Sequence, residues 1–202
     1  MKMEINSCNT YSKIINIGCV NCIYNCHLKP HISQLMNKHT NICLNVILDH
    51  SRHLLNRLHD NSIDVCFSYL ATNEISYKCI PYKTDEIIFV TNSQNIQFSN
   101  GIHNGEILHL PIIYSKFMPK SGFDWIHDIF PPHYVFQFTI SVIKEIIPFL
   151  LQYPYYAFLP RKLIEKELKD GLLIEIPLLD YHIPPLQSYI IMKSNAKYNP
   201  LD

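Results

Sequence analysis

The stretch DHSRHLLNRLHDNSIDVCF, residues 49–67, carries the clearest folding pattern of the chain. Leu54, Leu55 and Leu58 recur at helical spacing, so they predict a helix with one apolar face. The chain then runs into IDVCFSYL (63–70), whose β-branched and aromatic residues predict a buried strand. A surface helix that leads straight into a buried strand is typical of α/β proteins.

The residues before this stretch continue the same alternation toward the N-terminus. Strands are predicted at KIINIGCV (13–20) and NICLNVIL (41–48), because both runs are rich in isoleucine and valine. Between them, apolar residues at helical spacing from Leu28 to Met36 predict a first helix. The order β-α-β-α-β implies a parallel sheet.

The residues after position 70 predict a second α/β unit. CIPYKTDEIIFVTNS (79–93) is expected to form a strand, and SNGIHNG (99–105) is expected to form a turn because it holds two glycines and two asparagines. We place a boundary between two lobes near this turn. Strands and helices then alternate again, ending in a strand pair around 173–179 and 186–193.

Two residues predict the limits of helices in the second unit. Pro148 lies within SVIKEIIPFLLQ (141–152), where its missing N–H should kink or shorten the helix. Gly171 is expected to end the helix RKLIEKELKDGL (161–172).

The totals for the whole chain restrict its class. With 202 residues, 48% of them hydrophobic, the chain can build one sizeable core or two small lobes. Seventeen Lys and Arg balance seventeen Asp and Glu, so we do not expect this chain alone to bind DNA. The first residues, MKMEINSCNTYSK, lack the apolar core of a signal peptide, and no run approaches the roughly 20 apolar residues of a spanning helix. We expect a cytoplasmic protein with no membrane partner.

Seven cysteines, an odd number, all fall within the first 79 residues, and we expect them to be reduced. Cys19, Cys22 and Cys26 have the spacing of one helical stripe and could share a metal with His27 or His31. A structural zinc site needs four converging ligands, however, and no second C-x-x-C or H-x-x-x-H pair follows downstream. We therefore predict no metal and no other cofactor, and we keep a thiol-sensing or metal-sensing module as an alternative.

Several segments, in order, resemble one known family. They are INIG (15–18), the helix ending before Asn41-Ile42, residues 49–67, YYAFLPR (155–161) and ELKDGLLIEIPL (167–178). Together they resemble the effector-binding, or substrate-binding, domain of LysR-type transcriptional regulators over nearly all of residues 13–194. The resemblance implies an α/β fold of the two-lobed, type 2 periplasmic-binding-protein-like class, in which each lobe is a mixed sheet flanked by helices.

The resemblance also implies how the chain is divided. Residues 13–93 and 174–194 would form lobe I, and residues 94–173 would form lobe II. The winged helix-turn-helix that binds DNA in such regulators is absent from this chain, so DNA would be contacted only through that missing domain. At Tyr153, Pro154 and Tyr155 the chain departs from the glycine-containing turn that is usual in the family.

The function implied by the resemblance is regulatory. A small-molecule effector would bind in the cleft between the lobes and change the arrangement of the lobes or of a homodimer. In that homodimer the first helix of one subunit would pack on the second lobe of the other. In the family a hydroxyl residue in the first strand-to-helix turn commonly contacts the effector, and Cys22 stands at the matching position.

Candidate ligand-binding residues follow from the rule that ligands bind at the carboxyl ends of strands in open α/β sheets. Each candidate ends a predicted strand or begins the next helix. The candidates are Val20, Asn21, Cys22, His50, Ser51, Ser68, Tyr69, Ser115, Lys116, Thr139 and Ser141. Ser51 could instead serve only as a helix cap, Cys22 could instead be a redox sensor or a packing residue, and Lys116 could simply be a solvated lysine.

An enzyme is the less favoured class. The chain contains no G-x-S-x-G, H-E-x-x-H, P-loop or G-x-G-x-x-G motif. Cytoplasmic enzymes with two-lobed architecture exist, and for such an enzyme Asp49 and His50 are the best candidates for a general acid and base.

Overall fold

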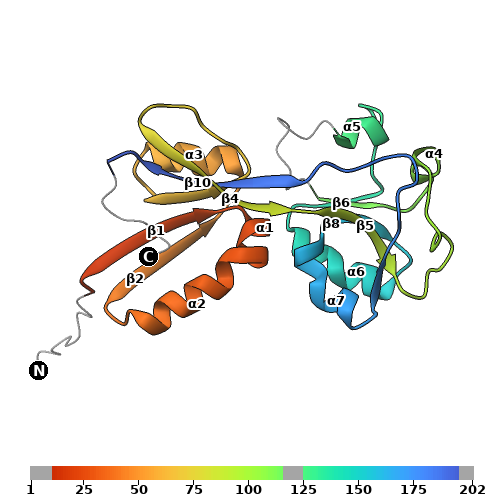
Figure 1. The fold of residues 1–202 in the computed structure, drawn as a ribbon, viewed down its shortest axis with the longest axis horizontal. Coiled ribbons are helices and arrows are strands. Elements are labelled where there is room, and N and C mark those ends of the chain that lie inside the picture. Colours follow the sequence, from red (N-terminus) through yellow and green to blue (C-terminus); the bar gives the residue numbers. More distant parts are fainter. Residues whose placement is uncertain (1–10, 116–124, 196–202) are drawn as a thin grey trace, which may run out of the picture.

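The computed structural model describes residues 11–115 and 125–195, which form two lobes lying side by side (Figure 1). The first lobe contains a five-stranded sheet, and the second contains a three-stranded sheet and a two-stranded sheet. Within the described ranges, every helix is too short or too polar to cross a bilayer.

The first sheet has the strand order β2-β1-β3-β10-β4. β1 runs parallel to both β2 and β3, which confirms the predicted β-α-β-α-β unit. β10 runs antiparallel to both of its neighbours. The strands of this sheet are β1 (Lys13–Cys19), β2 (Ile42–Leu48), β3 (Val65–Ser68), β4 (Tyr77–Asp85) and β10 (Leu186–Lys193).

Helices cover both faces of the first sheet (Figure 1). β2 and β3 lie on opposite sides of β1, so two right-handed crossovers place their helices on opposite faces. One crossover is a continuous helical run, and the other is α3. The elements are α1 (Asn21–Ile23), the π-helical turn η1 (Tyr24–Leu28), α2 (Lys29–Lys38) and α3 (Ser51–His59).

The apolar stripe of α3 holds that helix against the sheet. Leu54 and Leu58 are buried, as the sequence pattern predicts. A Cβ atom at Gly18 of β1 would lie 2.4 Å from Cδ1 of Ile63 and 3.0 Å from Cδ2 of Leu54. Gly18 therefore allows the close approach of α3 and the following loop to the first strand.

The second lobe is built around β5 (Ile87–Asn92), which pairs antiparallel with β8 (Tyr156–Pro160) and β9 (Leu173–Glu175). β6 (Ile113–Ser115) and β7 (Phe138–Ile140) form a separate parallel pair. Short helical elements surround these strands: α4 (Asn104–Ile107), α5 (Trp125–Ile129), η2 (Ile143–Glu145), α6 (Ile146–Gln152), η3 (Arg161–Ile164) and α7 (Glu165–Lys169).

Aromatic residues form the core of the second lobe. The ring of Phe89 on β5 stacks on Tyr156 with centroids 5.5 Å apart and contacts Phe158 at 4.6 Å. Trp125 packs against Phe158 at 5.2 Å, so α5 is fixed to the same core. These aromatic contacts therefore join β5, β8 and α5 within the second lobe.

The pairing of the strands corrects the predicted boundary between the lobes. Residues 79–93 do not form one strand: β4 ends in the first sheet, and β5 begins in the second sheet after Glu86. β9 likewise pairs with β5 and not with the first sheet. The apolar residues on both sides of Asp85 and Glu86 hid this crossing in the sequence, because they resemble one uninterrupted strand.

Pro148 shortens its helix, as predicted. The segment 141–152 begins as the 3-10 turn η2, and Pro148 is the third residue of α6. The N–H groups of the first helical turn lack intrahelical acceptors, so a proline there costs little. Gly171 follows α7 with a φ of +67°, in the left-handed conformation expected of a helix terminator.

Candidate functional site

The carboxyl ends of β1 and β2 lie next to each other at one edge of the first sheet. The two strands pair in parallel with Cys19 opposite Leu48, so the residues that follow them emerge at the same edge. Asn21 begins α1 immediately after β1, while Asp49 and His50 connect β2 to α3. This is the edge at which open α/β sheets bind ligands.

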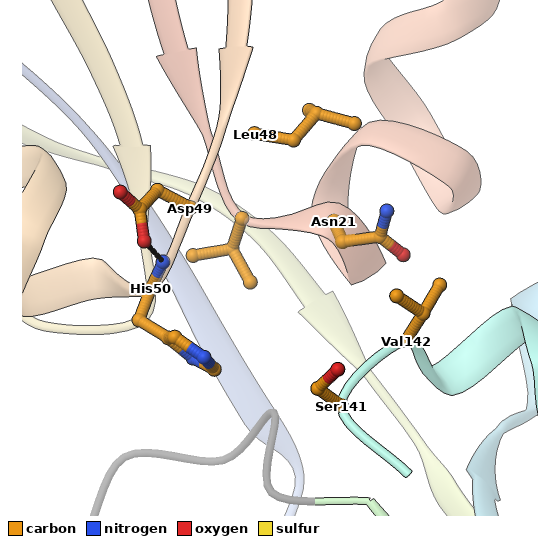
Figure 2. A pocket seen from close by; sticks show the side chains of 7 residues that line it. Asn21, Leu48, Asp49, His50, Ser141 and Val142 are labelled. Carbon is orange, nitrogen blue, oxygen red and sulfur yellow. Dashed lines mark hydrogen bonds between the residues drawn. The ribbon is translucent and has the colours of Figure 1, made fainter.

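A segment of the second lobe faces this edge. Ser141 and Val142 follow β7, and together with the strand ends of the first lobe they enclose a pocket of about 220 Å³ (Figure 2). The lining residues are Val20, Asn21, Leu48, Asp49, His50, Ser141 and Val142. Because both lobes supply walls, any change in their relative placement would change the shape of the pocket.

Two helical runs begin at the pocket. Val20 is the N-cap residue of α1, and His50 is the N-cap residue of α3; neither side chain hydrogen-bonds to the start of its helix. The first N–H groups of a helix lack intrahelical acceptors and carry partial positive charge. The pocket therefore favours a ligand that presents a polar or negatively charged group to these backbone donors.

The carboxylate of Asp49 lies in the pocket wall. Its Oδ1 accepts a hydrogen bond from the backbone N–H of His50 at 2.7 Å, the dashed line in Figure 2. Nδ1 of His53 lies 3.0 Å from the same oxygen, and Nε of Arg57 lies 3.8 Å from Oδ2. Burial alone would raise the pKa of Asp49, but these donors and charges together lower it. Asp49 is therefore ionised at neutral pH, and its charge is balanced within the first lobe.

Asp49 and His50 do not form the acid–base pair considered for an enzyme. Asp49 contacts the backbone of His50, and it is the ring of His53 that approaches its carboxylate. The ring of His50 packs edge to face on His53, with centroids 6.2 Å apart. Within residues 11–115 and 125–195, no hydrogen bond orients the His50 imidazole as a catalytic base would require.

The family model for the LysR substrate binding domain matches residues 9–201. The chain belongs to this family. No curated protein sequence matches the chain. The match extends through both lobes and through every residue of the pocket wall, so the pocket lies within the family's substrate-binding domain.

Solved LysR-type structures resemble this domain along most of its length. The regulatory domain of CrgA from Neisseria meningitidis is 12% identical with a TM-score of 0.73, over 93% of this chain and 92% of that one. A variant of the OxyR2 regulatory domain from Vibrio vulnificus is 14% identical with a TM-score of 0.69, over 98% and 92%. The effector binding domain of BenM with its effector benzoate is 18% identical with a TM-score of 0.64, over 94% and 87%. At these identities the likeness supports the fold, which is two-lobed and periplasmic-binding-protein-like.

Four of the predicted ligand-binding residues line the pocket of this LysR-type domain. Val20, Asn21 and His50 come from the first lobe, and Ser141 comes from the second. Sequence reasoning did not propose Leu48, Asp49 or Val142 as ligand contacts, although Asp49 was considered for catalysis. The sequence could still have indicated these three residues, because each lies within two residues of a predicted strand end or helix start.

Cys22 is not among the lining residues. Its side chain is fully buried one residue inside α1, and its Sγ lies 3.9 Å from Sγ of Cys26. Burial raises the pKa of Tyr69, and the neighbouring thiol of Cys22 adds to this shift. The turn predicted to place Cys22 at the ligand instead places Asn21 in the pocket wall, because Cys22 points into the lobe.

Ser51, Ser68 and Tyr69 are also buried, and they serve the framework behind the pocket. The hydroxyl of Ser51 accepts a hydrogen bond from the backbone N–H of Tyr69 at 3.2 Å, which joins the start of α3 to the end of β3. Ser51 is therefore not the helix cap that its position suggested. Ser68 accepts a hydrogen bond from the N–H of Leu70 at 2.9 Å.

The remaining predicted residues of the second lobe are spread out. Ser115 is buried, and its hydroxyl has no hydrogen-bond partner among the described residues. Thr139 is exposed on β7 and does not line the pocket. Lys116 lies outside the described residues.

The unusual Tyr153-Pro154 turn belongs to a different hollow. This hollow has a volume of about 240 Å³ and is lined by Asn92, Gln94, Asn95, Gln152, Tyr153 and Pro154. It lies wholly within the second lobe, so the departure from the family's glycine turn does not alter the pocket between the lobes.

Proposed function

We propose that this domain is the regulatory part of a LysR-type transcriptional regulator and binds its small-molecule effector in the pocket lined by Asn21, His50 and Ser141. One observation carries the proposal: both lobes contribute to a single pocket at the strand ends of the first sheet. A ligand in this position contacts both lobes at once.

The pocket restricts the chemistry of the effector. A volume of about 220 Å³ lies below the roughly 300–1,000 Å³ of pockets that hold drug-sized ligands, so the effector is a small molecule. Two helix starts favour a polar or anionic group, while Val20, Leu48 and Val142 offer apolar contact. BenM, a structural relative, binds benzoate, which combines these two features.

Regulation follows if the effector prefers one arrangement of the lobes. Two stretches join the lobes: the passage from β4 to β5, and the return from β9 to β10. An effector can shift the equilibrium between two arrangements only as far as it binds one of them better. Contact with Ser141 and Val142 supplies that preference, because these residues move with the second lobe.

The proposal includes a homodimer and a separate DNA-binding domain, as the resemblance implies. No residue of α2 is buried, and Met36 on this helix is 44% exposed, so α2 has apolar surface available to a second subunit. The purified protein should sediment as a dimer at micromolar concentration. A monomer under those conditions would remove this part of the proposal.

A pocket-blocking variant tests the effector site. We expect Ser141→Trp to fill the pocket and to abolish the thermal stabilisation that a bound small molecule gives the wild type. The measurement is a thermal-shift screen of small organic acids against both proteins. Thr139→Trp is the matched control, because Thr139 is exposed on the same segment but lies outside the pocket.

The two outcomes of this screen are distinct. A compound that stabilises the wild type and Thr139→Trp but not Ser141→Trp supports the site. A compound that stabilises all three proteins equally binds elsewhere, and it would contradict the assignment of the effector to this pocket.

A further inference from the structure

A second polar cluster lies in the first lobe and includes none of the residues that line the pocket. The helical run after β1 widens into the π-helical turn η1, which carries Cys26 and His27. These two residues face Asp85, the last residue of β4. The ligand atoms of the three side chains all lie within 4.8 Å of one another. Single π-helical turns are rare and occur frequently at functional sites.

Asp85 is a buried acidic residue whose side chain contacts a histidine. Its residue is 3% exposed, and both carboxylate oxygens lie near Nε2 of His27, at 2.8 and 3.0 Å. Among the described residues, His27 is the ion-pair partner of Asp85, and no lysine or arginine reaches it within 4.0 Å. The buried side chain of Asp85 is therefore paired with a residue that is itself a common metal ligand.

Two buried thiols adjoin this pair. Cys26 is 6% exposed and Cys22 is fully buried. Their sulfur atoms lie 3.9 Å apart, close to the separation of about 3.8 Å for two thiolates on one tetrahedral zinc ion with Zn–S bonds of about 2.3 Å. The two sulfur atoms are thus already spaced as ligands of one metal.

We propose that Cys26, His27 and Asp85 bind a thiophilic divalent metal ion, with zinc the first candidate and Cys22 as the fourth ligand. Thiolate, imidazole and carboxylate are the donors that zinc takes in proteins, and four protein ligands make a closed structural site. Cys22 lies beyond the 4.8 Å group, so its sulfur shifts toward the ion when the site fills.

Metal binding would change the protonation and the net charge of the four ligands. Each thiol releases its proton to solvent on binding, and the contact between His27 and Asp85 is replaced by one bond from each residue to the metal. Two thiolates, one carboxylate and a divalent ion leave one negative charge.

The local sequence around the cysteines does not contain all the ligands that a metal site needs. The stretch from Cys19 to His31 offers thiols and imidazoles, but no second C-x-x-C or H-x-x-x-H pair follows it. The missing ligand is a carboxylate, contributed by Asp85 from a distant strand. Asp85 also precedes the crossing from β4 to β5, so a bound ion would tie the first helix to the connection between the lobes.

Native mass spectrometry and cobalt absorption test the proposal. The full chain, kept reduced and freed of metal with a chelator, should bind one zinc ion per chain. Cobalt(II) should give the near-ultraviolet sulfur-to-metal absorption and the visible bands of tetrahedral thiolate coordination. Cys26→Ser, His27→Gln and Asp85→Asn should each weaken zinc binding at least tenfold, and Cys26→Ser should also remove part of the sulfur-to-metal absorption.

Cys43→Ser is the matched control, because Cys43 is a half-buried thiol on β2 outside the cluster. Far-UV circular dichroism checks that each variant is folded. If Cys26→Ser fails to fold, His27→Gln and Asp85→Asn still decide the question, since both keep a neutral hydrogen-bonding side chain. A wild-type chain that binds neither ion at micromolar concentration would overturn the proposal, as would equal zinc affinity in the control and in the folded cluster variants.

Discussion

The two walls of the pocket between the lobes differ in how they are supported. The first-lobe wall stands at the ends of two long paired strands in a five-stranded sheet, and α3 packs behind it through Leu54 and Leu58. The second-lobe wall, Ser141 and Val142, follows a three-residue strand that has a single partner strand. Under the proposed function, we therefore expect the first wall to fix the position of the effector and the second wall to move in response.

The largest expected effect is on the free energy of unfolding, and it shows whether the two lobes unfold together. Leu54→Ala in the first lobe should lower the free energy of unfolding by about 2–5 kcal/mol, and Phe89→Ala in the second by about 3–5 kcal/mol, because each leaves a cavity in a buried core. Denaturant unfolding can be followed by circular dichroism and by the fluorescence of Trp125, the single tryptophan, which lies in the second lobe. We expect both signals to shift together in both variants.

A shift of the circular dichroism alone in Leu54→Ala, with the Trp125 transition unchanged, would mean that the lobes unfold separately. Ile96→Ala is the control, because Ile96 is 70% exposed and its truncation should change stability by less than about 0.5 kcal/mol.

A smaller effect, on the Kd of a ligand, is expected when one polar side chain is removed from either wall of the pocket. For a compound that passes the pocket-blocking test, Asn21→Ala should raise Kd about 2–10-fold, the usual value of one hydrogen bond. Ser141→Ala should raise Kd less, because an exposed serine on a weakly supported segment keeps more freedom when the ligand binds. Isothermal titration calorimetry measures both constants.

Asn25→Ala provides the control for this comparison. The side-chain amide of Asn25 donates to the backbone oxygen of Asn21 at 2.8 Å and to its Oδ1 at 3.2 Å, yet Asn25 does not line the pocket. A larger loss from Ser141→Ala than from Asn21→Ala would reverse the roles assigned to the two walls.

The smallest expected effect is on the pH dependence of stability, and it involves Glu86 between β4 and β5. Arg161 bridges Glu86 and Glu175 at 2.5 and 2.6 Å, and its hydrogen bond lowers the pKa of Glu86. A lowered folded-state pKa stabilises the protein above the unfolded value of about 4.3, and this stability is lost as pH falls through the folded value. The carboxylate is exposed, so Glu86→Gln should cost only about 0.2–1 kcal/mol at pH 7.

Urea midpoints at pH 7 and below pH 4 check this prediction. The advantage of the wild type over Glu86→Gln should be constant from pH 5 to 7 and should shrink toward zero in acid. An advantage that grows in acid would show that the charge of Glu86 opposes folding.

The first lobe was predictable because its pattern is local. The helical spacing of Leu54 and Leu58 and the β-branched strands around it give the order of elements, and the right-handed crossover rule then gives the sheet. The crossing at Asp85 was not predictable in this way. Apolar runs on both sides of it have strand character, and only pairing with residues far along the chain assigns one run to each sheet.

The sequence predicted where in the fold the candidate site lies, but it did not predict which side chains point into the pocket. Strand ends and helix starts identify Asn21, His50 and Ser141 without any knowledge of orientation. The direction of each side chain depends on the pitch of the helix that follows, and for that reason Cys22 points into the lobe. The pairing of His27 with Asp85 joins residues 58 positions apart, and no local pattern encodes such a contact.

The place of β10 has a consequence for how the protein is made. This strand lies between β3 and β4 and pairs with both, although it is the last strand among the described residues. While the ribosome is still synthesising the second lobe, β3 and β4 each present an unpaired edge, and such edges invite association with other chains. The first lobe is begun first but completed last. A nascent chain that stops before Leu186 leaves those two edges open permanently, so early termination should yield aggregates even though nearly all of both lobes has been translated.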